Sequence, residues 1–411
     1  MSGRVRYGRD VPSPDALTDP VVELTMQFVG INSVSPSLAP GSPGEAQIAE
    51  HLATRLSEAG YTTRLVVPDA DAGRVSLVAT RRGSAPGPTV VLNGHLDTVG
   101  VDGMTDPFTA RLDDGRLHGR GSSDMKGGVA GLVVAAEALA ARDVPGTVIV
   151  ALVADEEDGS IGAEAVIAEL TAELSASGER MDLCLIAEPT WLDVAVAHRG
   201  YAVVEVEFHG RAAHSSLPEE SVDAILAMSD LLAAVSAADR ALRDCPAHPL
   251  LGHGSIMTTV AHGGTAAFTV AASASLVIER RTLPGESPAA ALAEIDAMVD
   301  RIVAATTDLA ATTRLGWHRD AWEQDAAGTA EEFAVMLGTA LVAVGSPDPA
   351  RIGAPYWMES ALWQAAGVPT VVCGPAGGGL HAIDEWVDID QLTRFPNAVT
   401  AAVARFLEGS A

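Results

Sequence analysis

Two histidines and several carboxylates of this 411-residue chain follow apolar runs that are typical of buried strands. Four such runs are TVVLNGH (89–95), TVIVALVADEE (147–157), MDLCLIAEP (181–189) and PTVVCGP (369–375). The polar residues that end or follow them are His95, Asp97, Glu156, Glu157, Glu188 and His381. In open α/β sheets, ligands bind outside the carboxyl ends of the strands. The sequence therefore predicts that these side chains converge on one edge of a sheet.

Acids gathered at one edge need a compensating charge. Asp124 joins them from the glycine-rich turn GRGSSDMKGG (119–128), which precedes an apolar helix. Neighbouring carboxylates raise one another's pKa unless a cation compensates, and a metal is the obvious cation. With Asp124 as a bridging ligand, Glu157 and Glu188 as terminal ligands and one hydroxide, the negative charge would balance two Zn²⁺.

The histidines complete the predicted centre. His95 and His381 would each supply one nitrogen, and such mixed N/O ligands suit zinc, with cobalt or manganese as alternatives. Asp97 is placed to accept the other imidazole N–H of His95 and so to orient it. Glu156 is predicted to be the general base that passes a proton from water to the leaving amine. Taken singly, these residues also fit turn hydrogen bonds or a solvated acidic turn; their joint order and strand-end placement favour the metal site.

The elements that must position these residues alternate as in α/β proteins. Segments 21–31 and 45–60 have helical spacing, and short β-branched runs then alternate with helical segments. Between about 198 and 318 the pattern changes to alternating strands and two helices in the order βαββαβ. We therefore predict a catalytic α/β domain in two parts, 1–197 and 319–411, with an α+β domain inserted at 198–318.

Composition limits the partners and the compartment. The chain has 26 Lys+Arg against 54 Asp+Glu, a net charge of −28, which argues against nucleic acid or an anionic membrane as partner. The most apolar run, 127–141, is too short to span a bilayer, and MSGRVRYGRD lacks the apolar stretch of a signal peptide. The three cysteines are widely separated, and Cys184 and Cys373 are interpreted as small buried apolar residues. We expect a cytoplasmic protein.

The order of the motifs resembles the zinc-dependent amidohydrolases and exopeptidases of the M20 type. That family includes acetylornithine deacetylase, succinyl-diaminopimelate desuccinylase, aminoacylases and glutamate carboxypeptidases. The motifs, which cover most of the chain, are GHLDTV, GRGSSDMKGG, ADEEDGSIGA, AEPT, GRAAHSSLPEESVDAI, RRTLPGE and GLHAIDEWV. The resemblance implies a mixed-sheet catalytic domain with helices on both faces. The roles that it implies are one metal on His95, Asp124 and Glu188, a second on Asp124, Glu157 and His381, Glu156 as base, and Asp97 orienting His95.

The resemblance also implies that the insert is a lid and dimerisation domain. In such a homodimer, His214 of GRAAHS would reach the partner's active site and stabilise the tetrahedral oxyanion. Arg281 of ERRTLP would hold the α-carboxylate of the substrate, although an ordinary strand-end salt bridge explains this arginine equally well. The chain departs from the family pattern at Phe268 and Ala271, where Asn and Pro are common, so a substrate-contacting amide is missing. Glu359 stands where Asp is common.

Lys126 is the only lysine of the chain, and the other 25 of its 26 Lys+Arg residues are arginines. It follows Asp124 by two residues, at the start of a helix. We hypothesise that its flexible ammonium fits among carboxylates behind the metal ligands, where the planar fork of arginine would not. A composition that drifted towards arginine and spared one lysine is the alternative.

The predicted function is hydrolysis of the amide bond of an N-acyl amino acid or short peptide by metal-bound hydroxide, with Glu156 as base. A dipeptidase or carboxypeptidase with the same centre is the alternative. Glu188, where aminopeptidases of the family more often have Asp, favours a deacylase or carboxypeptidase. A serine hydrolase is disfavoured because the chain has no G-x-S-x-G, and a dinucleotide-binding oxidoreductase because GRGSSD lacks the third glycine. A purely binding protein would not need a spare base such as Glu156.

Overall fold

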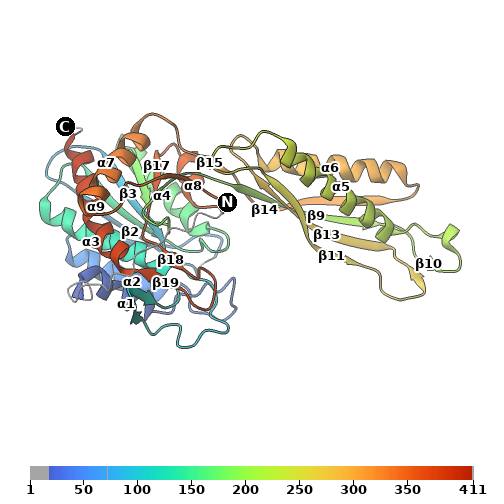
Figure 1. Cartoon of the computed structure of the whole chain (residues 1–411), viewed down its shortest axis with the longest axis horizontal. Coiled ribbons are helices and arrows are strands. Elements are labelled where there is room, and N and C mark those ends of the chain that lie inside the picture. The colour runs from blue at the N-terminus through green and yellow to red at the C-terminus, as the bar shows by residue number, and fades with distance from the viewer. Residues whose placement is uncertain (1–17, 72, 410–411) are drawn as a thin grey trace. The chain divides into compact units, whose positions relative to one another are not determined.

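The computed structural model describes residues 18–71 and 73–409, and the chain divides into two compact units (Figure 1). Unit 1 consists of segments up to Ala195, Gln324–Arg351 and from Met358 onward, and unit 2 of Val196–Glu323 and Ile352–Trp357. Unit 2 thus takes in a short second segment that the sequence analysis did not assign to it. The stretch MSGRVRYGRD, for which no signal peptide is predicted, lies outside the described residues.

Unit 1 is built on a mixed sheet with the strand order β1-β2-β6-β3-β7-β17-β8. The strands are β1 (Thr62–Val66), β2 (Ser76–Arg82), β3 (Thr89–His95), β6 (Thr147–Val153), β7 (Leu183–Ile186), β8 (Val194–His198) and β17 (Thr370–Val372). β3 runs parallel to β6 and β7, and β7 runs parallel to β17. β2 and β8 are antiparallel to their neighbours. Every residue of β3, β6 and β7 is buried, as their continuous apolar character predicts.

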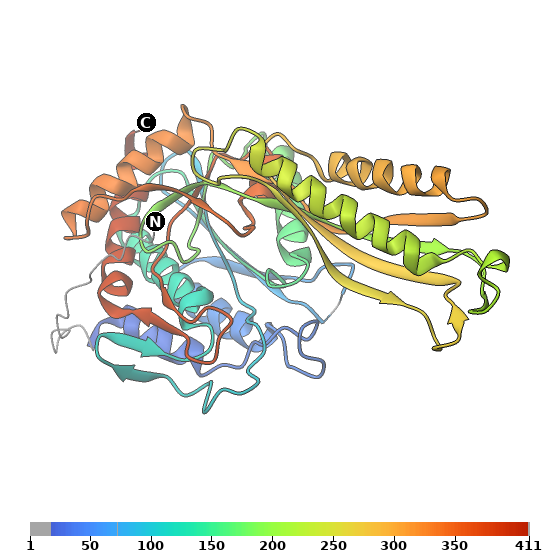
Figure 2. The same ribbon diagram turned by 45° about the vertical axis from the view of Figure 1, so that its right-hand side comes forward.

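Helices cover both faces of this sheet (Figure 2). They are α1 (Pro20–Val29), α2 (Ala46–Glu58), α3 (Gly127–Arg142), α4 (Ile161–Ala176), α7 (Thr329–Ala343), α8 (Ser360–Ala365) and α9 (Ile389–Gly409). α1, α3 and α9 contact one another on one face, while α4 and α8 contact one another on the other. A small separate sheet contains β4 (Arg111–Asp113), β5 (Arg116–His118), β18 (Gly377–Gly378) and β19 (Trp386–Asp388). The predicted α/β class with a mixed sheet is confirmed.

Unit 2 has an antiparallel sheet with the order β11-β13-β9-β14 and two helices that pack on it. Its main elements are β9 (Gly200–His209), α5 (Ala224–Asp244), β11 (Ser255–Gly263), β13 (Ser273–Thr282), α6 (Pro288–Ala305) and β14 (Ala310–Arg319). Burial alternates along β9 and β13, so one face of the sheet forms the core under α5 and α6. This order is the predicted βαββαβ.

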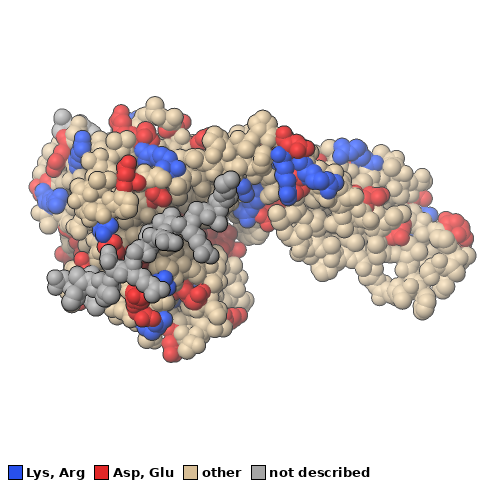
Figure 3. Space-filling view, in the orientation of Figure 1, with Lys and Arg blue, Asp and Glu red and all other residues tan. Residues whose placement is uncertain are grey.

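Smaller elements complete the two units. They are η2 (Ser122–Lys126), β10 (Ala213–His214), η3 (Pro218–Glu220), β12 (Thr269–Val270), β15 (Trp322–Glu323) and β16 (Arg351–Ala354). Cys184 and Cys373 are buried and Cys245 is exposed, and none of the three forms a disulfide. Across residues 18–71 and 73–409, no helix combines the length and the apolar character needed to cross a membrane. Acidic side chains are scattered over the visible surface of both units, interspersed with arginines (Figure 3).

Candidate metal centre

The parallel strands of unit 1 bring four polar segments to one edge of the sheet. His95 is the last residue of β3, and Glu188 follows the neighbouring strand β7 by two residues. Glu156 and Glu157 follow β6, which pairs with the other side of β3. His381 comes after β17, beyond the short strand β18. Because all four strands run parallel, their carboxyl ends point to the same edge.

Asp124 reaches this edge from η2, a wide turn that leads directly into α3. The backbone of Asp124 leaves the helical region, with φ −117° and ψ 95°. One carboxylate oxygen, Oδ1, lies 3.0 Å from His95 Nε2, and the other, Oδ2, lies 3.5 Å from His381 Nε2. The two oxygens of Asp124 therefore face two different imidazoles, as a bridging carboxylate would.

Two groups of three ligand atoms share Asp124. In the first group, His95, Asp124 and Glu188 have their ligand atoms within 4.8 Å of one another, and His95 Nε2 lies 3.8 Å from Glu188 Oε1. In the second group, Asp124, Glu157 and His381 meet the same limit, and His381 Nε2 lies 3.0 Å from Glu157 Oε2. The structure thus brings together all five residues that the sequence predicts as metal ligands.

The acids of the centre resist ionisation. Burial is the largest cause that raises the pKa of Glu188 and of Glu157, and the neighbouring charge of Asp124 raises both further. Burial, followed by the charge of Glu188, also raises the pKa of the half-buried Glu156. Asp124 is the exception: burial opposes its ionisation, but hydrogen bonds with His381 and His95 outweigh burial and lower its pKa. The cluster needs more positive charge than the chain supplies there.

The histidines respond to the same imbalance. Burial lowers the pKa of His95, but its hydrogen bond with Asp124 and the charge of Glu188 outweigh burial, so the pKa is raised. Hydrogen bonds with Asp124 and Glu157 raise the pKa of His381 to about 10. Protons on the imidazoles thus act as the counter-charge of the acids.

The residues present fit divalent cations. The ligand set is two imidazole nitrogens and three carboxylates, which is borderline between hard and soft. Glu157 Oε1 is buried and has no hydrogen-bond partner among the described residues, so one acceptor is left for a cation. Cations in place of the imidazole protons would relieve the repulsion that raises the carboxylate pKa values.

Asp97 differs in its contacts from the prediction. The Nδ1 of His95 lies 3.0 Å from the main-chain oxygen of Asp97 and 3.7 Å from its carboxylate. The carboxylate instead accepts the main-chain N–H groups of Glu156, at 3.1 Å, and Glu157, at 3.2 Å. Asp97 therefore holds the imidazole through its carbonyl and the acidic turn through its side chain.

Arg74 was missed by the sequence analysis, because an arginine in a turn before a strand is usually solvent-exposed. Its side chain is fully buried. Arg74 pairs with Glu45 at 2.5 Å, Asp155 at 3.0 Å and Asp97 at 3.5 Å. It also donates to the hydroxyl of Ser35 at 2.9 Å. This one guanidinium supplies a positive charge that three buried carboxylates behind the acidic turn share, and no sequence pattern revealed it.

Lys126 is fully buried, and its Nζ donates to the main-chain oxygen of Ile31 at 2.8 Å. Burial lowers its pKa to about 7, against the opposing charge of Glu385. Of the carboxylates hypothesised around Lys126, Glu385 is the one whose charge acts on it. The ammonium itself donates its hydrogen bond to a main-chain carbonyl.

The remaining predicted residues lie in unit 2. His214, in β10, is exposed, and its Nδ1 lies 2.7 Å from the hydroxyl of Ser216. Arg281, in β13, pairs with Glu279, and its guanidinium lies 5.5 Å from the ring centre of Tyr201. The strand-end salt bridge considered for Arg281 is therefore present, and its role towards substrate stays a prediction.

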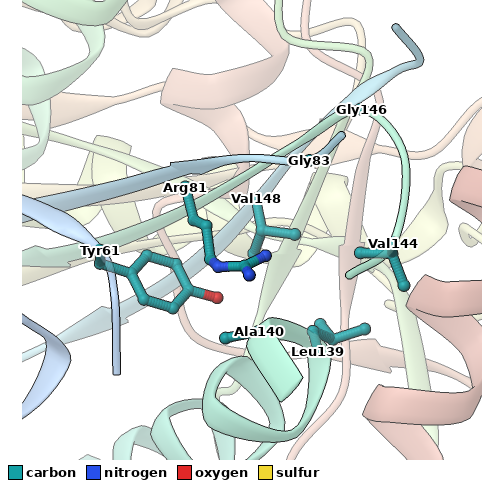
Figure 4. Close-up of a pocket in the computed structure, with 8 residues that line it drawn as sticks. All are labelled: Tyr61, Arg81, Gly83, Leu139, Ala140, Val144, Gly146 and Val148. Atoms are coloured by element: carbon teal, nitrogen blue, oxygen red, sulfur yellow. The ribbon is translucent and has the colours of Figure 1, made fainter. Parts of the chain in front are cut away.

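A separate small pocket of unit 1 contains none of these residues (Figure 4). Residues that line it are Tyr61, Arg81, Gly83, Leu139, Ala140, Val144, Gly146 and Val148. The Tyr61 hydroxyl already donates to the main-chain oxygen of Ala136 at 2.9 Å, and Arg81 lies 4.0 Å from Asp143. The polar side chains that line this pocket, those of Tyr61 and Arg81, therefore each already face a partner.

Comparison with known proteins shows similarity to hydrolases over most of the chain. Residues 91–405 match the profile of Peptidase family M20/M25/M40. Succinyl-diaminopimelate desuccinylase of Stenotrophomonas maltophilia (strain K279a) is 30% identical over 405 residues, 94% of this chain and 99% of the relative. Acetylornithine deacetylase of Myxococcus xanthus is 27% identical over 372 residues, 88% of this chain and 92% of the relative.

Solved structures share the fold. A tripeptidase from Staphylococcus aureus superposes with a TM-score of 0.74 at 17% identity, covering 95% of this chain and 98% of its own. A metallo-carboxypeptidase from Sulfolobus solfataricus gives 0.73 at 16% identity, covering 95% of this chain and 100% of its own. At these identities the likeness establishes the architecture alone.

Replacement of Arg74 tests the buried ion network. In Arg74→Met, three carboxylates lose their counter-charge in the interior, and we expect the protein to lose about 3–5 kcal/mol of its free energy of unfolding. Arg82→Met is the matched control, because Arg82 pairs with Glu179 at the surface. Urea unfolding of both variants measures the difference, and equal losses would contradict the network's importance.

Metal binding should strengthen as pH rises. Ligands must be unprotonated to bind a cation, yet the pKa of His381 is raised to about 10, so between pH 6 and 8 binding must expel at least this proton. We expect affinity for Co²⁺ to rise roughly tenfold per pH unit for each proton released. Competition with a chromophoric chelator at pH 6, 7 and 8 measures it; an affinity independent of pH would refute the raised pKa.

Proposed function

This chain belongs to peptidase family M20/M25/M40, and on that premise we propose that it hydrolyses the amide bond of an N-acyl amino acid with a pair of zinc ions. As a member of this family it is a metal-dependent hydrolase that acts on C–N bonds. The identity of the metal, the count of two and the N-acyl substrate are the proposed part.

The observation that carries the proposal is the shared carboxylate of Asp124. Its two oxygens face His95 and His381 separately, at 3.0 and 3.5 Å. A terminal carboxylate completes each side, Glu188 on the first and Glu157 on the second. One bridging and two terminal carboxylates with two imidazoles form the ligand set that two Zn²⁺ would share.

A bound pair of zinc ions would polarise the scissile carbonyl and lower the pKa of water towards neutrality. The chain's own residues prepare this chemistry. The Asp97 carbonyl can only accept a hydrogen bond, so Nδ1 of His95 keeps its proton, and Nε2 is the nitrogen that would lose a proton and bind a metal. The main-chain N–H groups of Glu156 and Glu157 both donate to the Asp97 carboxylate, which holds this turn in place. In the proposed mechanism Glu157 binds the metal and Glu156 takes the proton.

Glu156 is the proposed proton carrier. Burial and the charge of Glu188 raise its pKa, which suits a group that must accept a proton from water and then release it to the leaving amine. Glu156 belongs to neither three-residue ligand group. It is thus left free for the proton.

Support for an N-acyl amino acid comes from the two relatives. A desuccinylase and a deacetylase match nearly the whole chain, and both names describe removal of an acyl group. A dipeptidase or carboxypeptidase remains the alternative, because the Staphylococcus and Sulfolobus neighbours with the same fold are peptidases. The choice between them is one of substrate, since the centre would be the same.

We further propose that unit 2 forms a homodimer. β11 is an edge strand of the unit 2 sheet, and Met257 and Val260 on it are exposed. Ile225 and Leu226 at the start of α5 are exposed as well, and such apolar surface beside an open strand edge is typical of an interface. His214 would then serve the partner's centre as an oxyanion donor, and Arg281 would hold the substrate carboxylate.

A substrate screen tests the function. We expect the zinc-loaded enzyme to hydrolyse N-acetyl or N-succinyl amino acids faster than dipeptides. In Glu156→Gln we expect kcat to fall about 10²–10⁴-fold with full metal content, because the proton acceptor is lost. Asp158→Asn, a change to a half-buried acid in the same turn, is the control and should leave kcat near wild type. Faster cleavage of dipeptides would select the alternative, and unchanged turnover of Glu156→Gln would remove the mechanism.

Subunit complementation tests the dimer and His214. His214→Ala should lower kcat by about 10²–10³-fold without changing the molar mass in light scattering. Co-expressed at equal levels with Glu156→Gln, it should recover roughly one quarter of wild-type activity, because half of the dimers are mixed and each holds one intact site. No recovery, or a monomeric wild type, would exclude a shared site.

A further inference from the structure

Glu385 is a buried acid that no part of the proposed reaction uses. It lies four residues after His381, immediately before β19, and is 2% exposed. Its carboxylate accepts four hydrogen bonds from the turn that carries Asp124. Oε2 accepts from Arg120 Nη1 and from the Gly121 N–H, both at 2.8 Å, and Oε1 accepts from the N–H groups of Ser123 and Asp124, both at 3.0 Å.

Arg120 extends this contact to the loop of His381. Its Nη2 donates to the main-chain oxygen of Ala382 at 3.0 Å, and its Nε donates to that of Gly100 at 3.1 Å. The Gly119 N–H also donates to the main-chain oxygen of Glu385, at 3.2 Å. The segment before Asp124 and the segment after His381 are therefore joined by both side chains and backbone.

We propose that Glu385 is a positioning residue that holds the bridging carboxylate of Asp124 in register with His381 and thereby sets the affinity of the second metal position. This inference rests on the two-metal function proposed above. The bond to the Asp124 N–H fixes the residue whose two oxygens must face two cations. The link through Arg120 and Ala382 fixes the loop of His381, whose side chain is 56% exposed and so gains little support from packing.

The negative charge of Glu385, with two equivalent acceptors, is essential to this role. A glutamine has one acceptor oxygen and one amide group that only donates. In Glu385→Gln, the new amide NH₂ group would replace one of the two carboxylate oxygens. It would then face two N–H donors, from Arg120 and Gly121 in one orientation or from Ser123 and Asp124 in the other. The nearly isosteric change therefore breaks two hydrogen bonds at Asp124's turn without removing volume.

The two metal positions should respond unequally. The first position keeps His95 and Glu188, which lie at or just after the ends of buried strands, and neither residue is among the four donors to the Glu385 carboxylate. The second position depends on His381, whose loop is joined to Glu385 and Arg120. Loss of Glu385 should weaken the second position more than the first.

The experiment titrates the metal-free full chain with Co²⁺, following visible absorption and chelator competition. In Glu385→Gln we expect one of two Co²⁺ to bind about 10–100-fold more weakly, the other to change little, and the lost kcat to return with excess metal at nearly unchanged KM. Glu331→Gln is the matched control, because Glu331 also pairs with an arginine, Arg351, and should bind both ions as wild type does.

Glu385→Asp is the second variant, should the glutamine variant fail to fold. It keeps the charge but is one methylene shorter, so the second ion should again be the weaker one, to a smaller extent. Wild-type affinity for both ions in a folded Glu385 variant would overturn the inference. Equal weakening of both ions, with a lower unfolding midpoint and no rescue by metal, would also overturn it. If wild type itself fails to bind two ions or to hydrolyse amides, the proposed function fails instead.

Discussion

Electrostatic repulsion among buried carboxylates is the constraint on which this structure depends. Glu156, Glu157 and Glu188 meet at one sheet edge because β6 and β7, which flank β3 and run parallel to it, both end there. Each has a raised pKa for the same reason, burial beside other acids. Burying ionised carboxylates next to one another costs free energy, because each carboxylate is better solvated in water. The arrangement is tolerable only with positive charge in its midst, and the imidazoles of His95 and His381 meet that demand only in part.

Behind the ligands, the chain uses buried arginines as permanent counter-charges. Arg74 pairs with three acids that lie beyond the Glu156 turn and offsets part of their charge, and Arg120 pairs with Glu385 beyond Asp124. Arginine stays protonated at every accessible pH and offers several donors in fixed directions, so it can order several carboxylates at once. Among the described residues, no arginine pairs directly with a predicted ligand, so Arg74 and Arg120 act from behind the ligands.

Much of this could be predicted from sequence because the strand-end rule acts on local patterns. His95, Glu157 and Glu188 each follow a continuous apolar run, and sheet topology then brings them together. Arg74 and Glu385 could not be found in this way, since their partners lie far along the chain and nothing local distinguishes a buried arginine from an exposed one. The contacts of Asp97 also escaped prediction, because spacing indicates proximity to His95 but not whether the carbonyl or the carboxylate makes the bond. The 352–357 segment of unit 2 is too short to carry a pattern.

Asp97 supports two parts of the centre through different atoms. Its carbonyl holds an imidazole, and its carboxylate holds the backbone of the adjacent acid pair. The carbonyl belongs to the main chain and is kept by any residue, whereas the carboxylate is lost when Asp97 is replaced by an apolar residue. Variation at this position would therefore alter the support of Glu156 and Glu157 before that of His95, so the two supports can diverge separately.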